Sequence, residues 1–176
     1  MVGKIKKRVK LRKLKVSDAK RMLELISNDR VLEHLMTGNT VKDIKLDDEK
    51  KFIRFVVSQY SKKRPEEYHL GVEVRNKLVG VIGANDINWK KGLAEIGYWF
   101  GEDYWGKGYA TDSIRQFSDI LFEQLELKKI QALPFSFNKA SQRVLEKAGY
   151  KFKKERKKAV KRAGKYLDDV VWEKER

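Results

Sequence analysis

A glycine-broken loop between an apolar strand and a helix constrains this chain more than any other stretch. It lies within residues 96–111, which read IGYWFGEDYWGKGYAT. Glycine adopts positive φ angles without steric cost, so Gly106 and Gly108 allow successive backbone amides to converge on one anion. A helix that begins near Tyr109 would add its free N–H groups and the positive end of its dipole. The stretch therefore predicts a phosphate-binding loop.

Two common phosphate-binding motifs do not match this loop. The Walker motif places a lysine after its second glycine, whereas Lys107 lies between the two glycines. The dinucleotide fingerprint has a third glycine where this chain has Thr111, and it opens the first strand-helix unit of its domain. Here the loop lies past the middle of the chain. Both motifs are excluded, and the phosphate ligand stays open at this point.

Composition limits the possible classes of protein. The 176 residues, 41% hydrophobic, predict one domain over residues 1–176. The chain has no cysteine and only two histidines, which excludes disulfides and thiol catalysis, and we predict no metal site. No run of about 18 uncharged apolar residues exists, and Met1–Lys6 lacks the apolar core of a signal peptide. We therefore expect no membrane association and a cytoplasmic location.

The formal net charge of +16 has two interpretations. It favours an anionic partner, such as a nucleic acid, the ribosome or a polyphosphate cofactor. The alternative is a heavily charged, solvated surface of the kind that hyperthermophiles carry. Basic residues are spread along the chain, with one concentrated block over residues 151–165. The charge leaves a weak association with nucleic acid or ribosome open, and it disfavours polycationic substrates such as polyamines.

The first third of the chain has the periodicity of helices. After a short strand within residues 9–14, Ser17 is predicted to cap a first helix. Asn28 begins a second helix that Gly38–Asn39 ends, and a third helix follows Asp47. We expect the third helix to bury Phe52, Phe55, Val56 and Tyr60.

The rest of the chain begins with strand-like alternation. Residues 68–74, 78–87 and 93–100 predict an antiparallel meander that ends at the glycine loop. The following elements are predicted to be a helix over 110–121, a strand over 130–133, a helix from Asn138 to Gly149, and a hairpin over 150–162 and 166–173. This order predicts an α/β protein of the α+β type, with a mixed, mostly antiparallel sheet of about seven strands and helices on both faces.

Three short segments together resemble the GNAT superfamily of N-acetyltransferases. They are residues 105–110 (WGKGYA), 138–141 (NKAS) and 145–150 (LEKAGY), in the order and at the separations of that superfamily. More narrowly, the chain resembles the RimJ/RimL branch, whose characterised members acetylate the N-termini of ribosomal proteins. The resemblance covers nearly the whole chain from Leu11 onward. It implies a GNAT fold, acetyl-CoA as the cofactor and coenzyme A as a product.

The superfamily's cofactor motif is [Q/R]-x-x-G-x-[G/A]. Gly108 and Ala110 match its last two fixed positions. Trp105 stands where most members have Gln or Arg, although the RimJ/RimL branch commonly has Trp there. Trp105 is interpreted as an aromatic residue that floors the loop, with direct cofactor contact as the alternative.

The resemblance assigns groups to each part of the cofactor. The amides from Gly106 to Thr111 would bind the pyrophosphate, and the backbone of residues 98–100 would pair with pantetheine like an added strand. Asn138 would bind the pantetheine arm or serve only as a helix cap. Lys107 and Arg143 would bind phosphates or be solvated. The predicted cofactor-binding residues are Tyr98, Trp99, Phe100, Gly106, Lys107, Gly108, Tyr109, Ala110, Thr111, Asn138 and Arg143.

Two residues are candidates for acid-base catalysis. Glu95 resembles the catalytic glutamate that histone-acetylating members carry at nearly the same distance before the glycine loop; the alternative is a structural carboxylate paired with a lysine. Many members donate a proton to the leaving thiolate from a tyrosine where this chain has Leu145. Ser141 is the substitute that the RimJ/RimL resemblance offers, and the alternative is a helix-surface serine. A backbone N–H of residues 98–100 is the expected oxyanion donor.

The leading hypothesis is transfer of an acetyl group from acetyl-CoA to the N-terminal α-amine of a protein, of the ribosomal-protein type. One alternative is a GNAT enzyme that acetylates a small-molecule amine. An alternative of another class is a non-catalytic module that binds nucleic acid or the ribosome through the basic surface. A monomer and a homodimer are equally compatible with the sequence.

Overall fold

The computed structural model describes residues 8–35 and 41–176. The predicted end of the second helix at Gly38–Asn39 lies outside these described residues. The strands are β1 (Lys10–Arg12), β2 (Tyr68–Val74), β3 (Lys77–Asn88), β4 (Leu93–Phe100), β5 (Lys129–Ala132), β6 (Lys151–Arg162) and β7 (Lys165–Glu175). The helices are α1 (Ala19–Ile26), α2 (Asp29–Glu33), α3 (Leu46–Gln59), α4 (Tyr109–Glu123) and α5 (Lys139–Lys147), with 3-10 turns η1 (Val16–Asp18), η2 (Val41–Asp43) and η3 (Glu102–Tyr104).

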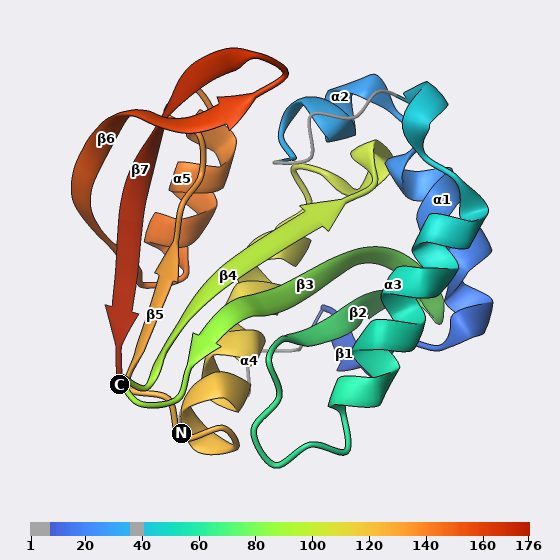
Figure 1. The fold of residues 1–176 in the computed structure, drawn as a ribbon, viewed down its shortest axis with the longest axis horizontal. Helices are drawn as coiled ribbons and strands as arrows, with labels where there is room; N and C mark the ends of the chain where they lie inside the picture. Colours follow the sequence, from blue (N-terminus) through green and yellow to red (C-terminus); the bar gives the residue numbers. More distant parts are fainter. Residues whose placement is uncertain (1–7, 36–40) are drawn as a thin grey trace.

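The strands form one seven-stranded sheet in the order β1-β2-β3-β4-β5-β7-β6 (Figure 1). Neighbouring strands are antiparallel except for β4 and β5, which are parallel. The β2–β3 turn consists of Arg75 and Asn76, whose φ angles are 48° and 62°. Two positive φ angles in succession are typical of the tight hairpin turns that match strand twist. The predicted mixed, mostly antiparallel sheet is confirmed.

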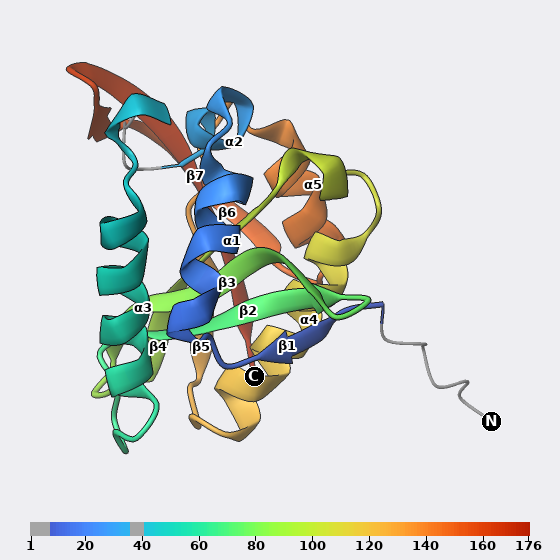
Figure 2. The same ribbon diagram turned by 90° about the vertical axis from the view of Figure 1, so that its right-hand side faces the viewer.

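Helices cover both faces of the sheet (Figure 2). On one face, α1 and α3 bury Met22, Ile53 and Val56 against Val81 of β3. On the other face, α4 contributes to the larger core, which also includes Ile82, Ile96 and Leu145. Side chains alternate between the two faces along each strand. The position of a residue in β3 or β4 therefore decides which layer of helices its side chain faces.

The start of α1 differs from the prediction. Ser17 lies inside the 3-10 turn η1, and Asp18 is the N-cap residue of the helix. The Asp18 carboxylate accepts a hydrogen bond from the Lys15 N–H at 2.8 Å and two from the Arg12 guanidinium at 2.8 and 2.9 Å. This ion pair holds the chain in a tighter turn first, which moves the helix start beyond Ser17. The predicted cap at Ser17 is wrong.

The buried face of α3 is also rotated relative to the prediction. Phe55 is exposed, whereas Ile53, Val56 and Gln59 are buried. These three residues follow the i, i+3, i+6 spacing that turns toward α1 and the sheet. The prediction for Val56 is confirmed, and the one for Phe55 is wrong. None of the helices in the described ranges is both long and apolar enough to span a membrane.

Candidate active site

The parallel strands β4 and β5 separate in the middle of the sheet. They pair only from Leu93 and Lys129 to Glu95 and Gln131, and their chains diverge beyond that point (Figure 1). The chain after β5 turns toward β7 instead, where Val170 N–H donates to the Pro134 carbonyl at 3.0 Å. A cavity of about 320 Å³ lies between the diverging strands, the glycine loop, α2 and α5. The divergence therefore creates the candidate site.

Most of the predicted site residues meet in this cavity. Those that line it are Glu95, Tyr98, Trp99, Phe100, Gly106, Ala110, Asn138 and Ser141. The others do not line it. Lys107 and Gly108 are exposed beside its mouth, Tyr109 and Thr111 are half-buried in the first turn of α4, and Arg143 is exposed on α5. The predicted set thus divides into a cavity wall and a surrounding rim.

The glycine loop presents a row of unpaired backbone amides. Gly106 and Gly108 have φ angles of 70° and 78°, and a Cβ on Gly106 would meet no heavy atom within 4 Å. Asp112 N–H makes the first helical hydrogen bond of α4, to the Gly108 carbonyl at 3.1 Å. Within the described chain, the N–H groups of residues 106–111 donate no hydrogen bond. Open space, free donors and the helix N-terminus together fit a phosphate group.

Trp105 anchors this loop to the end of β4. Its indole N–H donates to the Phe100 carbonyl at 2.8 Å, and its half-buried ring lines the cavity. The ring also packs against the buried cluster of Ile26, Val31 and Leu32. Trp105 thus supports the loop and also faces the cavity, so both sequence interpretations, a floor of the loop and a cofactor contact, stay predictions.

Tyr98 and Ser141 form a hydroxyl pair on the α5 side of the cavity. The Tyr98 hydroxyl lies 2.7 Å from Ser141 Oγ. The Ser141 N–H donates to Asn138 Oδ1 at 3.0 Å, which is the N-cap bond of α5. Burial raises the pKa of Tyr98 to about 12, against the opposing effect of the Ser141 hydrogen bond. Tyr98 therefore keeps its proton near neutral pH and can donate it to Ser141 Oγ.

Glu95 lies on the opposite face of β4 from Tyr98 and lines the same cavity. Its carboxylate forms no hydrogen bond or ion pair with any residue in the described ranges. Burial raises the pKa of Glu95, and the nearby charges of Asp86 and Asp169 add to that effect, while Arg156 opposes it. Arg156 is itself bound to Asp169, with Nε 2.7 Å from Oδ1. The site thus holds a carboxyl group that is free to exchange a proton.

Sequence reasoning missed two polar residues of the cavity. Asn85 of β3 lies directly opposite Glu95 in the strand register, and His34 ends α2. Counting pairs back from the β3–β4 turn could have placed Asn85 beside Glu95, because residues in register share a face. No motif surrounds His34, so its place in the cavity follows only from the fold.

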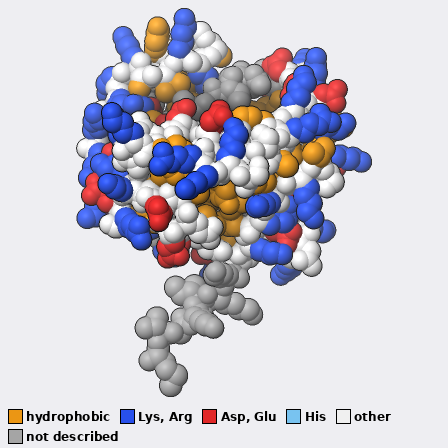
Figure 3. All heavy atoms as spheres, turned by 60° about the horizontal axis from the view of Figure 1, so that its bottom comes forward, with side chains coloured by type: hydrophobic (Ala, Val, Ile, Leu, Met, Phe, Trp, Pro, Cys, Tyr) orange, Lys and Arg blue, Asp and Glu red, His pale blue; other side chains and the backbone are white. Residues whose placement is uncertain are grey.

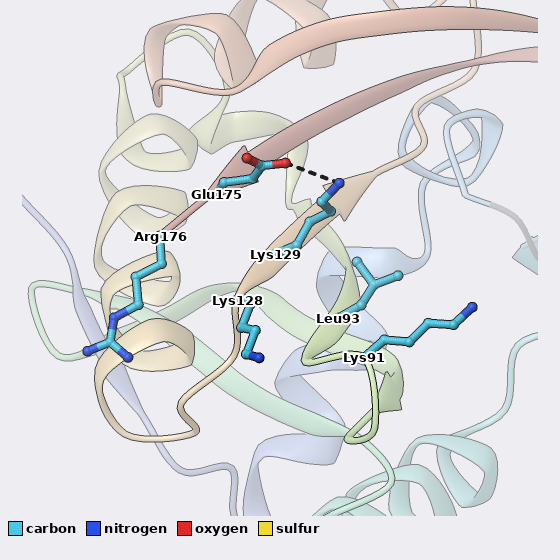
Figure 4. A pocket seen from close by; sticks show the side chains of 6 residues that line it. All are labelled: Lys91, Leu93, Lys128, Lys129, Glu175 and Arg176. Carbon is cyan, nitrogen blue, oxygen red and sulfur yellow. Dashed lines mark ion pairs between the residues drawn. The ribbon is translucent and has the colours of Figure 1, made fainter.

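A second, larger hollow lies at the other end of β4, remote from the glycine loop (Figure 4). Its volume is about 590 Å³, and it is lined by Lys91, Leu93, Lys128, Lys129, Glu175 and Arg176. Lys129 Nζ pairs with Glu175 Oε1 at 3.1 Å. None of the predicted site residues contributes to it. Volume alone therefore does not locate the site that the chemistry of the residues indicates.

Comparison with known proteins identifies the class of this chain. Residues 8–151 match the family described as the acetyltransferase (GNAT) domain. The chain belongs to this family, which confirms the family inferred from the sequence. It is an N-acetyltransferase that uses acetyl-CoA.

Individual proteins share the sequence or the fold of this chain. It is 31% identical to the Bacillus subtilis protein named probable N-acetyltransferase YjcK, over 94% of this chain and 92% of that protein. Its fold matches the ribosomal L7/L12 α-N-protein acetyltransferase RimL in complex with coenzyme A, with a TM-score of 0.85, 18% identity and coverage of 98% and 96%. Mycobacterium smegmatis RimJ matches with a TM-score of 0.85, 21% identity and coverage of 95% and 81%.

Proposed function

We propose that this enzyme acetylates the N-terminal α-amine of a protein, of the ribosomal-protein type. The observation that carries the proposal is the unengaged Glu95 carboxyl, whose raised pKa makes it a modest base in the cavity wall. An α-amine has a reference pKa of roughly 7.7–8.0, against about 10.4 for a lysine side chain. A modest base is therefore sufficient to deprotonate an α-amine near neutral pH, whereas a lysine amine would need a stronger one. The fold shared with RimL, a ribosomal L7/L12 α-N-protein acetyltransferase, supports the same substrate.

The glycine loop and β4 would hold the cofactor. The free amides of residues 106–111 would bind its pyrophosphate at the N-terminus of α4. Beyond Glu95, the side of β4 that would face β5 has no strand partner and borders the cavity. Its backbone would therefore pair with the pantetheine amides. Lys107 and Arg143, both exposed at the rim, would approach the phosphates. Acetyl-CoA supplies the activated acetyl group.

Glu95 would remove a proton from the acceptor amine. A neutral amine is the nucleophile in acetyl transfer, and a carboxylate in the cavity wall accepts the proton directly or through a water molecule. Its raised pKa makes Glu95 a stronger base than an ordinary glutamate. A backbone N–H at the cavity edge of residues 98–100 would stabilise the negative charge that develops on the acetyl oxygen.

Ser141 would give a proton to the leaving sulfur. Its Oγ accepts from the Tyr98 hydroxyl in the orientation that leaves its own hydrogen free to point into the cavity. Asn138 holds the Ser141 backbone through the N-cap bond. In this arrangement Ser141 acts on the sulfur, and Tyr98 is a positioning residue behind it.

Weak association with the ribosome or with nucleic acid through the basic surface stays a prediction. On the face that Figure 3 shows, Lys and Arg side chains are spread among acidic and hydrophobic ones and do not gather in one patch. A spread charge supports long-range attraction to an anionic particle more than a defined nucleic-acid site. We therefore propose at most an ancillary role for this surface.

The test is acetyl-CoA turnover with three kinds of acceptor. Free thiol release is measured with unblocked N-terminal peptides, with N-terminally blocked peptides that carry one lysine, and with small amines of matched size. The proposal predicts the highest kcat/KM for the unblocked peptides. Preference for a small amine would favour the small-molecule hypothesis. Absence of turnover with every acceptor, together with salt-sensitive RNA binding, would favour a non-catalytic module.

A further inference from the structure

Asn85 is an unassigned polar group beside the proposed base. It lies opposite Glu95 in the antiparallel register, and both side chains line the cavity. Residues directly opposite each other share a face, with Cβ atoms roughly 4.5–5.5 Å apart. Within the described ranges, the Asn85 side-chain amide forms no hydrogen bond. A group bound at Glu95 would therefore meet a free amide as its first polar neighbour.

An irregularity in β3 follows Asn85. The strand register shifts between Asn85 and Asn88, and Asp86 has a φ of 47°. A positive φ is uncommon for a residue other than glycine, and bulges next to active sites redirect side chains. The irregularity begins immediately after the residue that faces Glu95. Regular pairing of β3 with β4 is therefore interrupted next to the cavity wall.

His34 provides a second unpartnered group. Its Nδ1 is buried and has no hydrogen-bond partner among the described residues. The ring is held between Trp105 and Phe137, with centroids 6.0 and 5.9 Å away, and the residue lines the cavity. A buried polar atom without a partner is unfavourable, and a bound ligand that supplies the partner removes that cost.

The chemistry of this part of the cavity discriminates among amines. Around Asn85, Glu95 and His34 the wall includes the apolar residues Val31 and Leu35 of the α2 region. An α-amine at a peptide N-terminus has a carbonyl and an amide N–H within a few bonds. A lysine side chain or a polyamine offers only methylene groups there, which would leave the buried polar groups unpaired.

We propose that Asn85 and His34 bind the first peptide unit of the acceptor. The Asn85 side-chain amide would hydrogen-bond to the part of the peptide unit nearest the amine. His34, at the end of α2, would hydrogen-bond to the rest of that peptide unit. The inference rests on the proposed function, because it assumes that the amine binds at Glu95. It adds that the enzyme recognises the peptide bond that follows the amine.

The experiment compares two acceptors in three proteins. One acceptor is a dipeptide amide, and the other is a primary alkylamine with the same first side chain and no peptide group. The ratio of their kcat/KM values is measured for the wild type, for Asn85→Leu and for Gln131→Leu. Gln131 is the matched control because it is in register with Glu95 on β5 but does not line the cavity. We expect the ratio to fall about tenfold in Asn85→Leu only.

A second variant tests His34 without disturbing its packing. His34→Phe keeps an aromatic ring between Trp105 and Phe137 and removes the nitrogen atoms, and we expect a similar fall in the ratio. An unchanged ratio in both variants would overturn the inference while leaving peptide acetylation intact. A wild type that uses the alkylamine and not the dipeptide amide would instead contradict the proposed function itself.

Discussion

Glu95 shows how one residue obtains its chemistry from its surroundings. Its pKa is raised because the side chain is half-buried and lies near the carboxylates of Asp86 and Asp169. Asp169 is fully buried and bound to Arg156, so much of its charge is compensated. The result is a carboxyl group that is a stronger base than an ordinary glutamate.

We predict that Glu95→Gln lowers kcat about 100-fold, the range of a lost general base, and leaves the Kd of acetyl-CoA within about twofold. In the wild type, kcat/KM should fall on the acid side of a pKa above that of an ordinary glutamate, because protonated Glu95 accepts no proton. That acid limb should disappear in the variant. Glu123→Gln, an exposed residue at the end of α4, is the control. Equal turnover by Glu95→Gln and wild type at every pH would remove Glu95 from the mechanism.

The Tyr98–Ser141 pair leads to a second prediction at this scale. Tyr98→Phe should lower kcat about tenfold, and it should have no further effect in a Ser141→Ala background, because Tyr98 acts only through the Ser141 hydroxyl that it positions. Tyr150→Phe is a matched control, since its hydroxyl lies 2.9 Å from Ser118 Oγ, outside the cavity. Additive effects of the two changes on kcat, measured as a double-mutant cycle, would show that the hydroxyls act independently.

The sequence predicted residues within motifs and missed those outside them. Glu95, Asn138 and Ser141 were found because each stands at a fixed distance from the glycine loop or at a helix start. His34 and Asn85 belong to no local pattern, and their places in the cavity wall depend on how α2 and β3 meet β4. Such residues become visible only when the strand register and helix packing are known.

At the scale of elements, the glycine loop is the part whose backbone we propose to bind the cofactor. Its amides are free because Gly106 and Gly108 turn the chain with positive φ before α4 begins. Sequence predicted this conformation well, since glycine pairs before a helix have few alternatives. It predicted α1 and α3 less well, because the Arg12–Asp18 ion pair and the packing of Ile53 are tertiary contacts.

We predict that Gly106→Ala weakens acetyl-CoA binding about tenfold. An alanine at a φ of 70° is strained, and relief of that strain turns the loop amides away from their common direction. Gly164→Ala is the matched control: its φ is 78°, its Cβ would also meet nothing within 4 Å, and it lies in the β6–β7 turn. Both variants should lose similar stability in urea.

Calorimetric titration with coenzyme A separates the two effects. Only Gly106→Ala should show a raised Kd. An equal rise in both variants would mean that general destabilisation, and not the loop conformation, reduces binding.

At the scale of the whole molecule, the divergence of β4 and β5 gives the cavity two sides. The α5 side carries Tyr98 and Ser141, and the α2 side carries Glu95, Asn85 and His34. Because strand residues alternate between faces, cofactor and acceptor can approach the same point from different directions. The sequence predicted a strand at the position of β5, but it could not predict how far β4 and β5 diverge. That divergence follows from the short β5 and its pairing with β7.

Buried tyrosines predict a loss of stability in alkali. Burial raises the pKa of Tyr60 and Tyr98 to about 12 and raises that of Tyr150 further. Above pH 10 or so, the unfolded chain loses these phenolic protons while the folded chain keeps them. The free energy of unfolding should therefore be unaffected by them below about pH 10 and fall as pH rises toward 12, by up to about 1.4 kcal/mol per pH unit for the buried Tyr150 and by less for the half-buried Tyr60 and Tyr98.

Urea titrations at several pH values measure this slope. Tyr150→Phe should make it shallower, and Tyr166→Phe should not, because Tyr166 is 62% exposed. Formation of tyrosinate by all tyrosines at about pH 10, with the fold intact, would contradict the assignment.

The most direct test of the central claim is an internal competition between two amines. A peptide with a free α-amine and one internal lysine is incubated with the enzyme and acetyl-CoA, and mass spectrometry of early product locates the acetyl group. A cavity with the modest base Glu95 beside unpartnered Asn85 predicts acetylation of the α-amine alone. Acetylation of the lysine ε-amine, or an unmodified peptide under conditions in which a small amine is acetylated, would contradict the account.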